Sequence, residues 1–229
     1  MLNLSNKDPR GGKMYTLGEE IFNAITHGVG DLIAIAALVL LIVFAAVYGD
    51  GWCLASGIVY GITLVILYTM STLYHAITPE RAKRVFRIFD HCSIFLLIAG
   101  TYTPYSLVTL REVDFHGISL GWLIFGVIWG LAVVGIVFAA LRKSVKWVEV
   151  PLYVLMGWMI ILSIKDLVAN LAFGGVILLV AGGIVYTIGV VFFILHKYRY
   201  MHSIWHIFVL AGSILHFLSV LLYVFPVLG

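Results

Sequence analysis

Long apolar runs are the feature that most constrains how this chain folds. A helix needs about 20 mostly apolar residues to cross a bilayer, and only helices and closed barrels satisfy their backbone hydrogen bonds there. Seven such runs follow one another at about 22–48, 52–75, 88–110, 117–140, 147–164, 171–195 and 203–225. The pattern therefore predicts an all-α integral membrane protein, a bundle of seven transmembrane helices.

The composition agrees with this fold class. Of the 229 residues, 62% are hydrophobic and 11% are charged, whereas soluble domains carry about 25% charged residues. We expect residues 14–229 to form a single transmembrane domain and residues 1–13 to be a polar tail without a removable signal peptide. The basic residues are scattered and the net charge is only +3, so we expect no nucleic-acid partner.

The basic residues also predict the orientation of the chain, because Lys and Arg favour cytoplasmic loops. Twelve of the 14 fall before the first span or after the second, fourth and sixth spans. They are Lys7, Arg10, Lys13, Arg81, Lys83, Arg84, Arg87, Arg142, Lys143, Lys146, Lys197 and Arg199. We therefore expect a cytoplasmic N-terminus and an extracytoplasmic C-terminus, in the inner membrane of a bacterium.

Ionisable side chains within membrane spans are costly, and they are functional candidates for that reason. The second span ends in "STLYH", with Ser71 and His75 one helical turn apart, and the third begins with Asp90 in "FDHCSI". The seventh span begins with "HSIWH", which places His202 and His206 on one helix face. All three groups are predicted to lie at the cytoplasmic ends of their spans.

Three imidazoles converging from two spans suit a zinc site. Three nitrogen ligands leave one position open for water, which is the arrangement of catalytic zinc. We therefore predict Zn²⁺ bound by His75, His202 and His206. Asp90 would hold the water and accept its proton, and Ser71 would orient the site or donate to a substrate carbonyl.

A polar stripe along the first span is a further candidate. Glu20, Asn23, His27 and Asp31 recur at helical spacing after a predicted capping box of Thr16 and Glu19. The stripe surrounds the metal ligands, lines a cavity, or is simply the polar start of a helix. The sequence leaves these alternatives open.

Other polar and small residues are expected to serve packing. Cys53 and Cys92 are predicted near opposite membrane faces, where they do not pair, and Pro104 is expected to kink or end the third span. The remaining histidines are not expected to bind the metal; they are His91, His116, His196 and His216.

Pairs of glycines at GxxxG spacing occur in two spans. They are Gly57 with Gly61 and Gly126 with Gly130, and we expect both pairs to allow close helix approach.

The three motifs together resemble the signature of the hemolysin III family, and "EEIFNAITHGVG" resembles the start of its bacterial members. That family lies within the progestin and adiponectin receptor superfamily, with alkaline ceramidases as more distant relatives. The resemblance covers nearly the whole chain and implies a zinc site at His75, His202 and His206, with Asp90 and Ser71 beside it. It also implies action on lipids, since relatives hydrolyse ceramide-type amides and bacterial members are associated with cytolysis or membrane homeostasis. The long N-terminal region of the animal receptors is absent, which argues against a peptide-hormone receptor.

Several functions agree with these features. The first is a zinc-dependent hydrolase of lipid amides or esters, with membrane lipids as its partners. The second is a pore-forming or membrane-perturbing protein with structural zinc, and the third is a sensor or receptor of membrane state. A haem protein is a fourth, disfavoured because His202 and His206 share one helix face.

Overall fold

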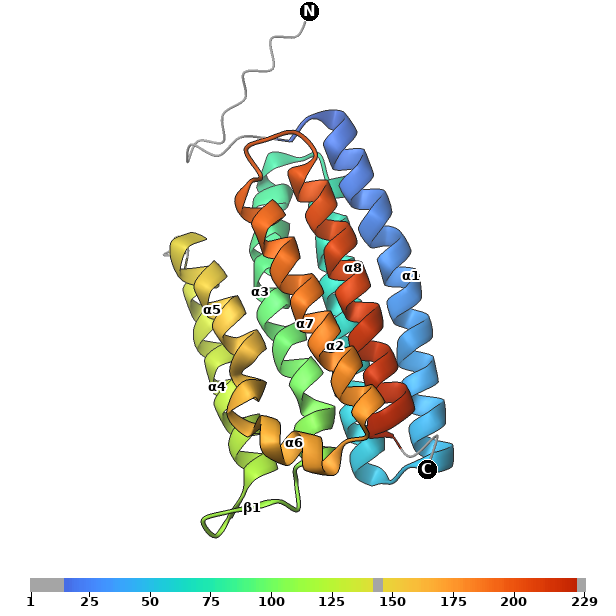
Figure 1. Cartoon of the computed structure of the whole chain (residues 1–229). Coiled ribbons are helices and arrows are strands. Elements are labelled where there is room, and N and C mark those ends of the chain that lie inside the picture. The colour runs from blue at the N-terminus through green and yellow to red at the C-terminus, as the bar shows by residue number, and fades with distance from the viewer. Residues whose placement is uncertain (1–14, 142–145, 226–229) are drawn as a thin grey trace, which may run out of the picture.

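The computed structural model describes residues 15–141 and 146–225; the predicted tail at 1–13 and most of the predicted loop after the fourth span lie outside them. The long helices are α1 (Leu17–Tyr48), α2 (Gly51–Ala76), α3 (Glu80–Pro104), α4 (Leu120–Ala140), α5 (Lys146–Trp158), α7 (Phe173–Ile194) and α8 (Met201–Ser219). A short helix, α6 (Ile164–Asn170), and a hairpin of β1 (Asp114–Phe115) and β2 (Ile118–Ser119) complete the fold (Figure 1).

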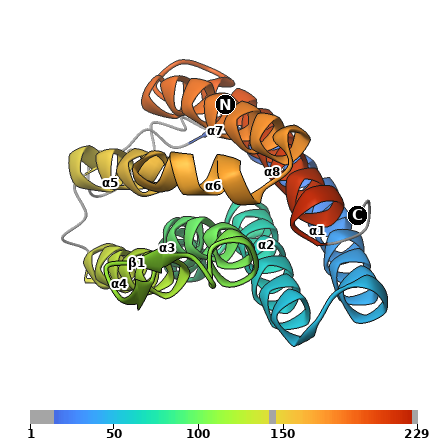
Figure 2. The same ribbon diagram turned by 60° about the horizontal axis from the view of Figure 1, so that its bottom comes forward.

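Within the described residues, seven helical segments are long and apolar enough to cross a membrane. The predicted seven-helix membrane bundle is therefore confirmed. Helix α1 packs against α2 and α8, α2 packs against α3, and α7 packs against α8. Seen from its end, the bundle has α8 between α1 and α7, while α4 and α5 lie to one side (Figure 2).

Two helices begin earlier than the hydropathy pattern predicts. Helix α1 begins at Leu17 because the predicted capping box forms: the Thr16 hydroxyl accepts from the Glu19 amide, and the Glu19 carboxylate accepts from the Thr16 amide at 2.9 Å. Helix α3 begins at Glu80, directly after Pro79. The four basic residues expected in a loop after the second span therefore lie on the first two turns of α3. Because these basic residues lie on a helix and not in a loop, the helix fixes the directions of their side chains at this end of the bundle.

The third and fifth spans depart from a regular α-helix. Helix α3 ends at Pro104, as predicted, and continues as a π-helical segment over Tyr105–Thr109. The fifth span was predicted to end at 164, but it bends through a 3₁₀ segment and continues as α6 to Asn170. The Tyr102 hydroxyl causes this bend: it donates to the Gly157 carbonyl at 3.0 Å and accepts from the Ile160 amide at 2.8 Å. A side chain inserted into the helical hydrogen-bond ladder produces such a bend.

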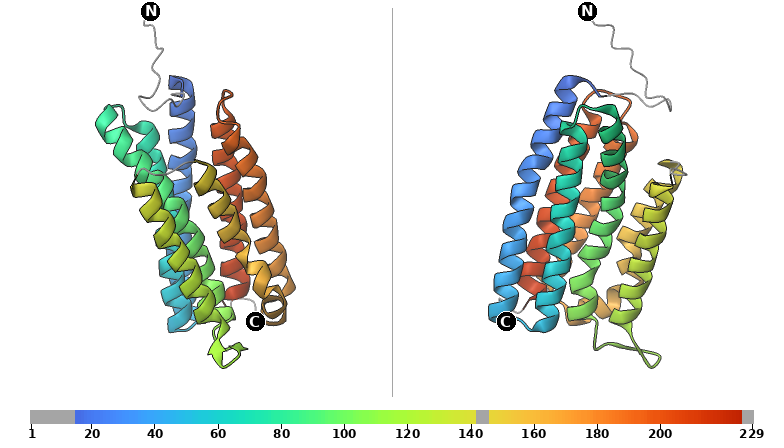
Figure 3. Two further views of the ribbon diagram at one scale, coloured as in Figure 1. Left: turned by 90° about the vertical axis from the view of Figure 1, so that its left-hand side faces the viewer. Right: turned by 180° about the vertical axis from the view of Figure 1, so that it is seen from behind.

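The four chain segments that carry the predicted site meet at one end of the bundle. The start of α1, the end of α2, the start of α3 and the start of α8 lie together in the views of Figures 1 and 3. The end of α8 lies at the opposite end, as an odd number of spans requires. The assignment of the site end to the cytoplasm stays a prediction from the basic residues.

The two glycine pairs behave differently. A Cβ atom added to Gly61 would lie 3.0 Å from the backbone Cα of Leu38, and one added to Gly57 would lie 3.1 Å from the Phe225 ring. These glycines allow close approach, as predicted. The prediction is wrong for Gly126 and Gly130, whose faces meet no other part of the described chain within 4 Å. Sequence spacing alone does not say which helix face has a neighbour.

Helix α2 begins with an acidic cap outside the membrane spans. The Asp50 carboxylate accepts from the backbone amides of Cys53 at 2.8 Å and Trp52 at 2.9 Å. The hydrogen bond from Cys53, assisted by the one from Trp52, lowers the pKa of the Asp50 carboxyl below its usual value.

We expect Gly61→Val to reduce the free energy of unfolding by about 1–3 kcal/mol, because the new side chain meets the backbone of α1. The matched control is Gly126→Val, which adds the same side chain to an open face. The measurement is the thermal unfolding midpoint of both variants in detergent. Equal midpoints for the two variants would contradict the packing described for α1 and α2.

The Asp50 cap predicts a pH dependence of stability. Because its folded pKa is lowered, the ionised cap stabilises the fold above the unfolded value of about 3.9, and this stabilisation is lost as the pH falls through the folded value. We expect Asp50→Ala to lose about 0.5–2 kcal/mol at neutral pH, with a smaller loss at pH 3. Asp50→Asn is the control, since it keeps a capping oxygen without a charge. Thermal unfolding midpoints at the two pH values test this, and a loss from Asp50→Ala that is the same at both would refute it.

Candidate metal centre

Helices α2 and α8 bring three histidines together. His75 lies in the last turn of α2, and His202 and His206 lie one turn apart at the start of α8. All three are buried, and one ligand atom from each lies within 4.8 Å of the other two. The structure therefore assembles a three-histidine group from residues 131 positions apart in the chain.

The spacing of the ring nitrogens fits a metal ion. The Nε2 atoms of His202 and His206 are 3.1 Å apart. Two nitrogens bound to one zinc at about 2.05 Å and a tetrahedral angle lie about 3.3 Å apart. The Nε2 atom of His75 is buried and has no partner among the described residues, although an unpaired buried nitrogen is costly. A cation between the three rings would satisfy that atom.

Glu20 fixes the orientation of His75. The Nδ1 atom of His75 lies 2.6 Å from the Glu20 carboxylate oxygen Oε2. Because a carboxylate only accepts, Nδ1 carries the proton and Nε2 keeps a free lone pair. Carboxylate–histidine pairs of this kind commonly support metal ligands. The predicted stripe on the first span thus reaches the candidate site through Glu20.

The other two histidines are held by different neighbours. The Nδ1 atom of His206 lies 3.4 Å from the Thr26 hydroxyl oxygen, which donates its own proton to backbone carbonyls of α1. The ring of His202 stacks on Tyr15, with centroids 4.8 Å apart and planes inclined by 22°. Tyr15 therefore covers the histidines at the end of the bundle. Burial, together with nearby Tyr74, Asp90 and Glu20, raises the pKa of Tyr15 well above its usual value, so Tyr15 remains a neutral phenol.

Helix α1 is tied directly to the start of α8. The Ser203 hydroxyl donates to the Asn23 side-chain oxygen at 2.6 Å. The Glu19 carboxylate accepts from the Tyr200 amide at 2.8 Å, and Tyr200 has a left-handed backbone with φ of 59°. These two contacts set the position of the first turn of α8. Asn23 and Glu19 therefore help to position His202 and His206.

His27 lies against the site. Its ring stacks on that of His206, with centroids 3.5 Å apart and planes inclined by 11°, and lies nearly perpendicular to the Tyr68 ring, with centroids 5.1 Å apart. In the described structure neither His27 ring nitrogen has a hydrogen-bond partner. Farther along the stripe, Asp31 accepts from the Thr69 hydroxyl at 3.0 Å. Glu20, Asn23 and His27 thus surround the three histidines, while Asp31 joins α1 to α2.

Asp90 and Ser71 lie together beside the site. The Ser71 hydroxyl is close enough to hydrogen-bond the Asp90 carboxylate, and His75 is near enough to interact with it electrostatically. Ser71 is buried on the helix face that also carries His75. Helix α3 therefore contributes a carboxylate, Asp90, beside the three histidines, in addition to Glu20 from α1.

The remaining histidines and cysteines lie away from this group. His216 contacts the Leu179 carbonyl at 3.0 Å, His196 contacts the Phe193 carbonyl at 3.0 Å, and His116 is exposed near the hairpin. Cys53 and Cys92 are both free, and the Cys92 thiol is directed to the Ile136 carbonyl on α4.

Two residues near the site carry no signal for it in the sequence. Tyr15 stacks on His202, and Lys83, which the sequence marks only as one of the basic residues after the second span, pairs with Glu20 at 2.9 Å. His91, which was not expected to bind the metal, contacts the buried Glu149 of α5 at 3.1 Å. In the sequence, Glu149 stands out only because it is an acidic residue near the start of the predicted span at 147–164.

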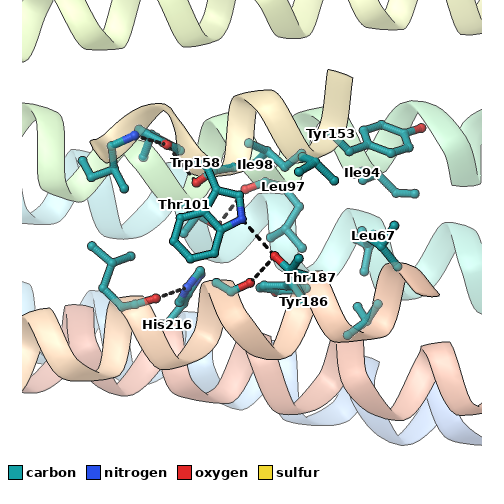
Figure 4. Close-up of a pocket in the computed structure, with 18 of the residues that line it drawn as sticks. Leu67, Ile94, Leu97, Ile98, Thr101, Tyr153, Trp158, Tyr186, Thr187 and His216 are labelled. Carbon is teal, nitrogen blue, oxygen red and sulfur yellow. Dashed lines mark hydrogen bonds between the residues drawn. The ribbon is translucent and has the colours of Figure 1, made fainter. Parts of the chain in front are cut away.

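An apolar pocket lies within the bundle, close to the three histidines at Phe193. It lies between α3, α5, α7 and α8, with Leu67 of α2 at its wall (Figure 4). Trp158 crosses it and donates to the Thr187 hydroxyl at 2.9 Å. Phe193 lines the pocket and also contacts the His202 ring, with centroids 6.0 Å apart. Phe193 therefore lies between the pocket and His202.

The fold and the site define a class: a seven-helix membrane protein with a buried three-histidine group that can hold a metal ion near one end of the bundle. Comparisons with known proteins make the class specific. The family model described as "Haemolysin-III related" matches residues 15–217. The chain belongs to this family, which confirms the resemblance found in its motifs.

Individual relatives agree with this assignment. The chain is 45% identical to Hemolysin-3 of Bacillus cereus, over 91% of this chain and 93% of that protein. It is 44% identical to the Hemolysin-3 homolog of Bacillus subtilis (strain 168), over 92% and 96% of the two chains. It is also 26% identical to the human monocyte to macrophage differentiation factor, over 97% and 92%, which fits the wider receptor superfamily. The chain is a multi-pass integral membrane protein, and its bacterial relatives fit the inner membrane of a bacterium.

The three-histidine group predicts the metal content of the protein. We expect about one zinc per chain after mild detergent purification, lost in His75→Ala and in His202→Ala because each removes one of three nitrogens. The control is His216→Ala, which removes a buried histidine that contacts a backbone carbonyl instead. Mass spectrometry of the metal in all four proteins is the measurement. Metal that survives both of the first two substitutions would exclude a shared site.

Proposed function

We propose that the chain is a zinc-dependent hydrolase that cleaves an amide or ester bond in a membrane lipid. The observation that carries the proposal is the juxtaposition of three buried imidazoles with Asp90 and an apolar pocket. Such a site has nitrogen donors for a metal, a carboxylate for proton transfer and a space for apolar chains.

Zinc is the metal that suits the donors. Imidazole nitrogens bind zinc well, and three of them leave a position open on a tetrahedral ion. A zinc ion held there supplies a Lewis acid that activates water at neutral pH and polarises a carbonyl. The chain itself supplies the orientation of the ligands, through the contacts that Glu20 and Thr26 make with His75 and His206.

Asp90 is the residue we assign to proton transfer. Its carboxylate lies beside His75 but comes from a different helix, so it can act next to the metal without binding it. Ser71, at hydrogen-bonding distance, holds the carboxylate in place. With Ser71 donating to one oxygen, the other oxygen can accept a proton and return it to the leaving group.

The apolar pocket supports a lipid as the substrate. A chain lying between α5 and α7 would run past Phe193, which contacts His202, and would carry the polar end of the lipid to the histidines. The Trp205 ring packs on the Phe193 ring, with centroids 5.5 Å apart. Together the two rings form the wall between the pocket and His202. Exclusion of water by these aromatic rings strengthens electrostatic interactions within the site.

A second candidate function follows from the name of a relative. The Bacillus cereus protein that is 45% identical is called Hemolysin-3, which points to membrane damage. In this alternative a metal bound by His75, His202 and His206 only joins α2 to α8, and Asp90 has no part in any reaction. The two candidates therefore differ in what they require of Asp90.

The variant Asp90→Asn separates the two candidates. We expect it to keep its zinc and to lose turnover of a lipid amide by roughly 10²–10⁴-fold, because an amide cannot accept the proton. The control is Asp114→Asn, on the exposed hairpin at the other end of the bundle. The measurements are metal content and hydrolysis of ceramide-type amides in mixed micelles.

Two results would count against the hydrolase. If Asp90→Asn hydrolyses the lipid as fast as the unsubstituted protein, Asp90 has no catalytic role. The structural-metal alternative is favoured by a different result. In it, the unsubstituted protein binds zinc but hydrolyses no lipid amide or ester, and the unsubstituted protein and Asp90→Asn release dye from vesicles equally.

A further inference from the structure

Lys83 is joined to the candidate metal centre through a single carboxylate. Its Nζ atom lies 2.9 Å from the Glu20 oxygen Oε1, and the other oxygen of the same group, Oε2, lies 2.6 Å from Nδ1 of His75. The three side chains come from α3, α1 and α2. They form a continuous chain of charge-assisted hydrogen bonds that ends on one of the three histidines.

Lys83 is itself held by the helix that carries His75. Its ammonium donates to the Tyr74 carbonyl at 3.0 Å and to the Ile77 carbonyl at 3.4 Å, and it lies 5.2 Å from the centre of the Tyr74 ring. The last carbonyls of a helix have no partners within it, and a basic side chain can satisfy them. The last turn of α2 therefore carries His75 and also holds Lys83, which contacts His75 through Glu20.

The degree of burial makes these contacts important. The side chain of His75 is fully buried, and those of Glu20 and Lys83 are 15% and 18% exposed. A carboxylate removed from water is costly unless it is paired, and a pair in this setting is screened less than one at the surface. The Lys83 ammonium is paired with the same Glu20 carboxylate that contacts the ring of His75.

We propose that Lys83 is a positioning residue of the metal centre. By holding Glu20, it fixes the ring orientation and the protonated nitrogen of His75, so that Nε2 faces the other two histidines. The inference rests on the proposed role of His75 as a metal ligand. A purely structural role, in which Lys83 only caps α2 and pairs with α1, would leave the metal unaffected.

The test compares zinc affinity and ligand geometry in position-83 variants of the full chain in detergent. Zinc affinity is measured by competition with a chelator, and ligand geometry by the visible absorption of the Co²⁺-loaded protein. We expect Lys83→Met to weaken zinc binding roughly tenfold and to alter the Co²⁺ bands, since loss of an outer contact of a metal ligand costs about 10–100-fold in affinity. Lys83→Arg should restore much of both, because it keeps a positive donor for the carboxylate.

Two further variants isolate the chain of contacts. The control is Arg81→Met, which removes an exposed basic residue two positions earlier on the same helix and should change neither reading. If Lys83 acts through Glu20, then Glu20→Gln should also weaken zinc binding. The double variant should then bind zinc no more weakly than Glu20→Gln alone, because both substitutions disrupt the same contact. Should Lys83→Met not fold, Lys83→Gln gives the same comparison with a neutral donor that can still reach the α2 carbonyls.

The outcomes separate this inference from the proposed function. If the unsubstituted protein binds zinc, and Lys83→Met lowers its thermal midpoint without changing zinc affinity or the Co²⁺ bands, Lys83 is only structural and the inference is wrong. If the unsubstituted protein binds no zinc, the metal centre fails first and the inference fails with it. Additive losses from the two single substitutions would show that Lys83 does not act through Glu20.

Discussion

The structure depends on one constraint: inside a bilayer, no solvent satisfies a polar group. The backbone meets it by forming seven helices. The polar side chains meet it by contacting one another, as when Ser203 donates to Asn23 and Tyr102 bridges two backbone groups of the fifth span. Among the described residues Nε2 of His75 is buried without such a contact, and we propose that a metal ion satisfies it.

Helix α1 organises the site although it supplies none of the three histidines. Glu20 orients His75, Thr26 lies against His206, and Asn23 is bonded to Ser203 on α8. Since α1 packs against both α2 and α8, one helix face sets the distance and the ring orientation between two others. Lys83 extends this arrangement to α3, so that the four helices that carry the site, α1, α2, α3 and α8, are linked.

The site and the pocket differ in chemistry but adjoin one another. The histidines lie where ionisable residues of four helices meet, whereas the pocket is lined mainly by aliphatic and aromatic side chains of α3, α5 and α7. Phe193 belongs to both, since it lines the pocket and contacts His202. A molecule with an apolar chain and a polar bond matches this pairing, which is why a lipid is the substrate class we propose.

The sequence alone determined the number of helices, the family and the depth of the site. Run length predicts spans, and the positions of His75, Asp90 and His202 relative to the span ends predict that they share one level of the membrane. Only the tertiary structure decided which neighbours each face meets. Gly61 lies against α1 whereas Gly126 meets no other part of the described chain within 4 Å, Lys83 reaches Glu20, and Tyr15 stacks on His202. It also decided that the fifth span bends at Tyr102 and runs on to Asn170. The physical reason is that hydropathy reports position along the membrane normal, while rotation about each helix axis and the choice of neighbours depend on side-chain packing between distant segments.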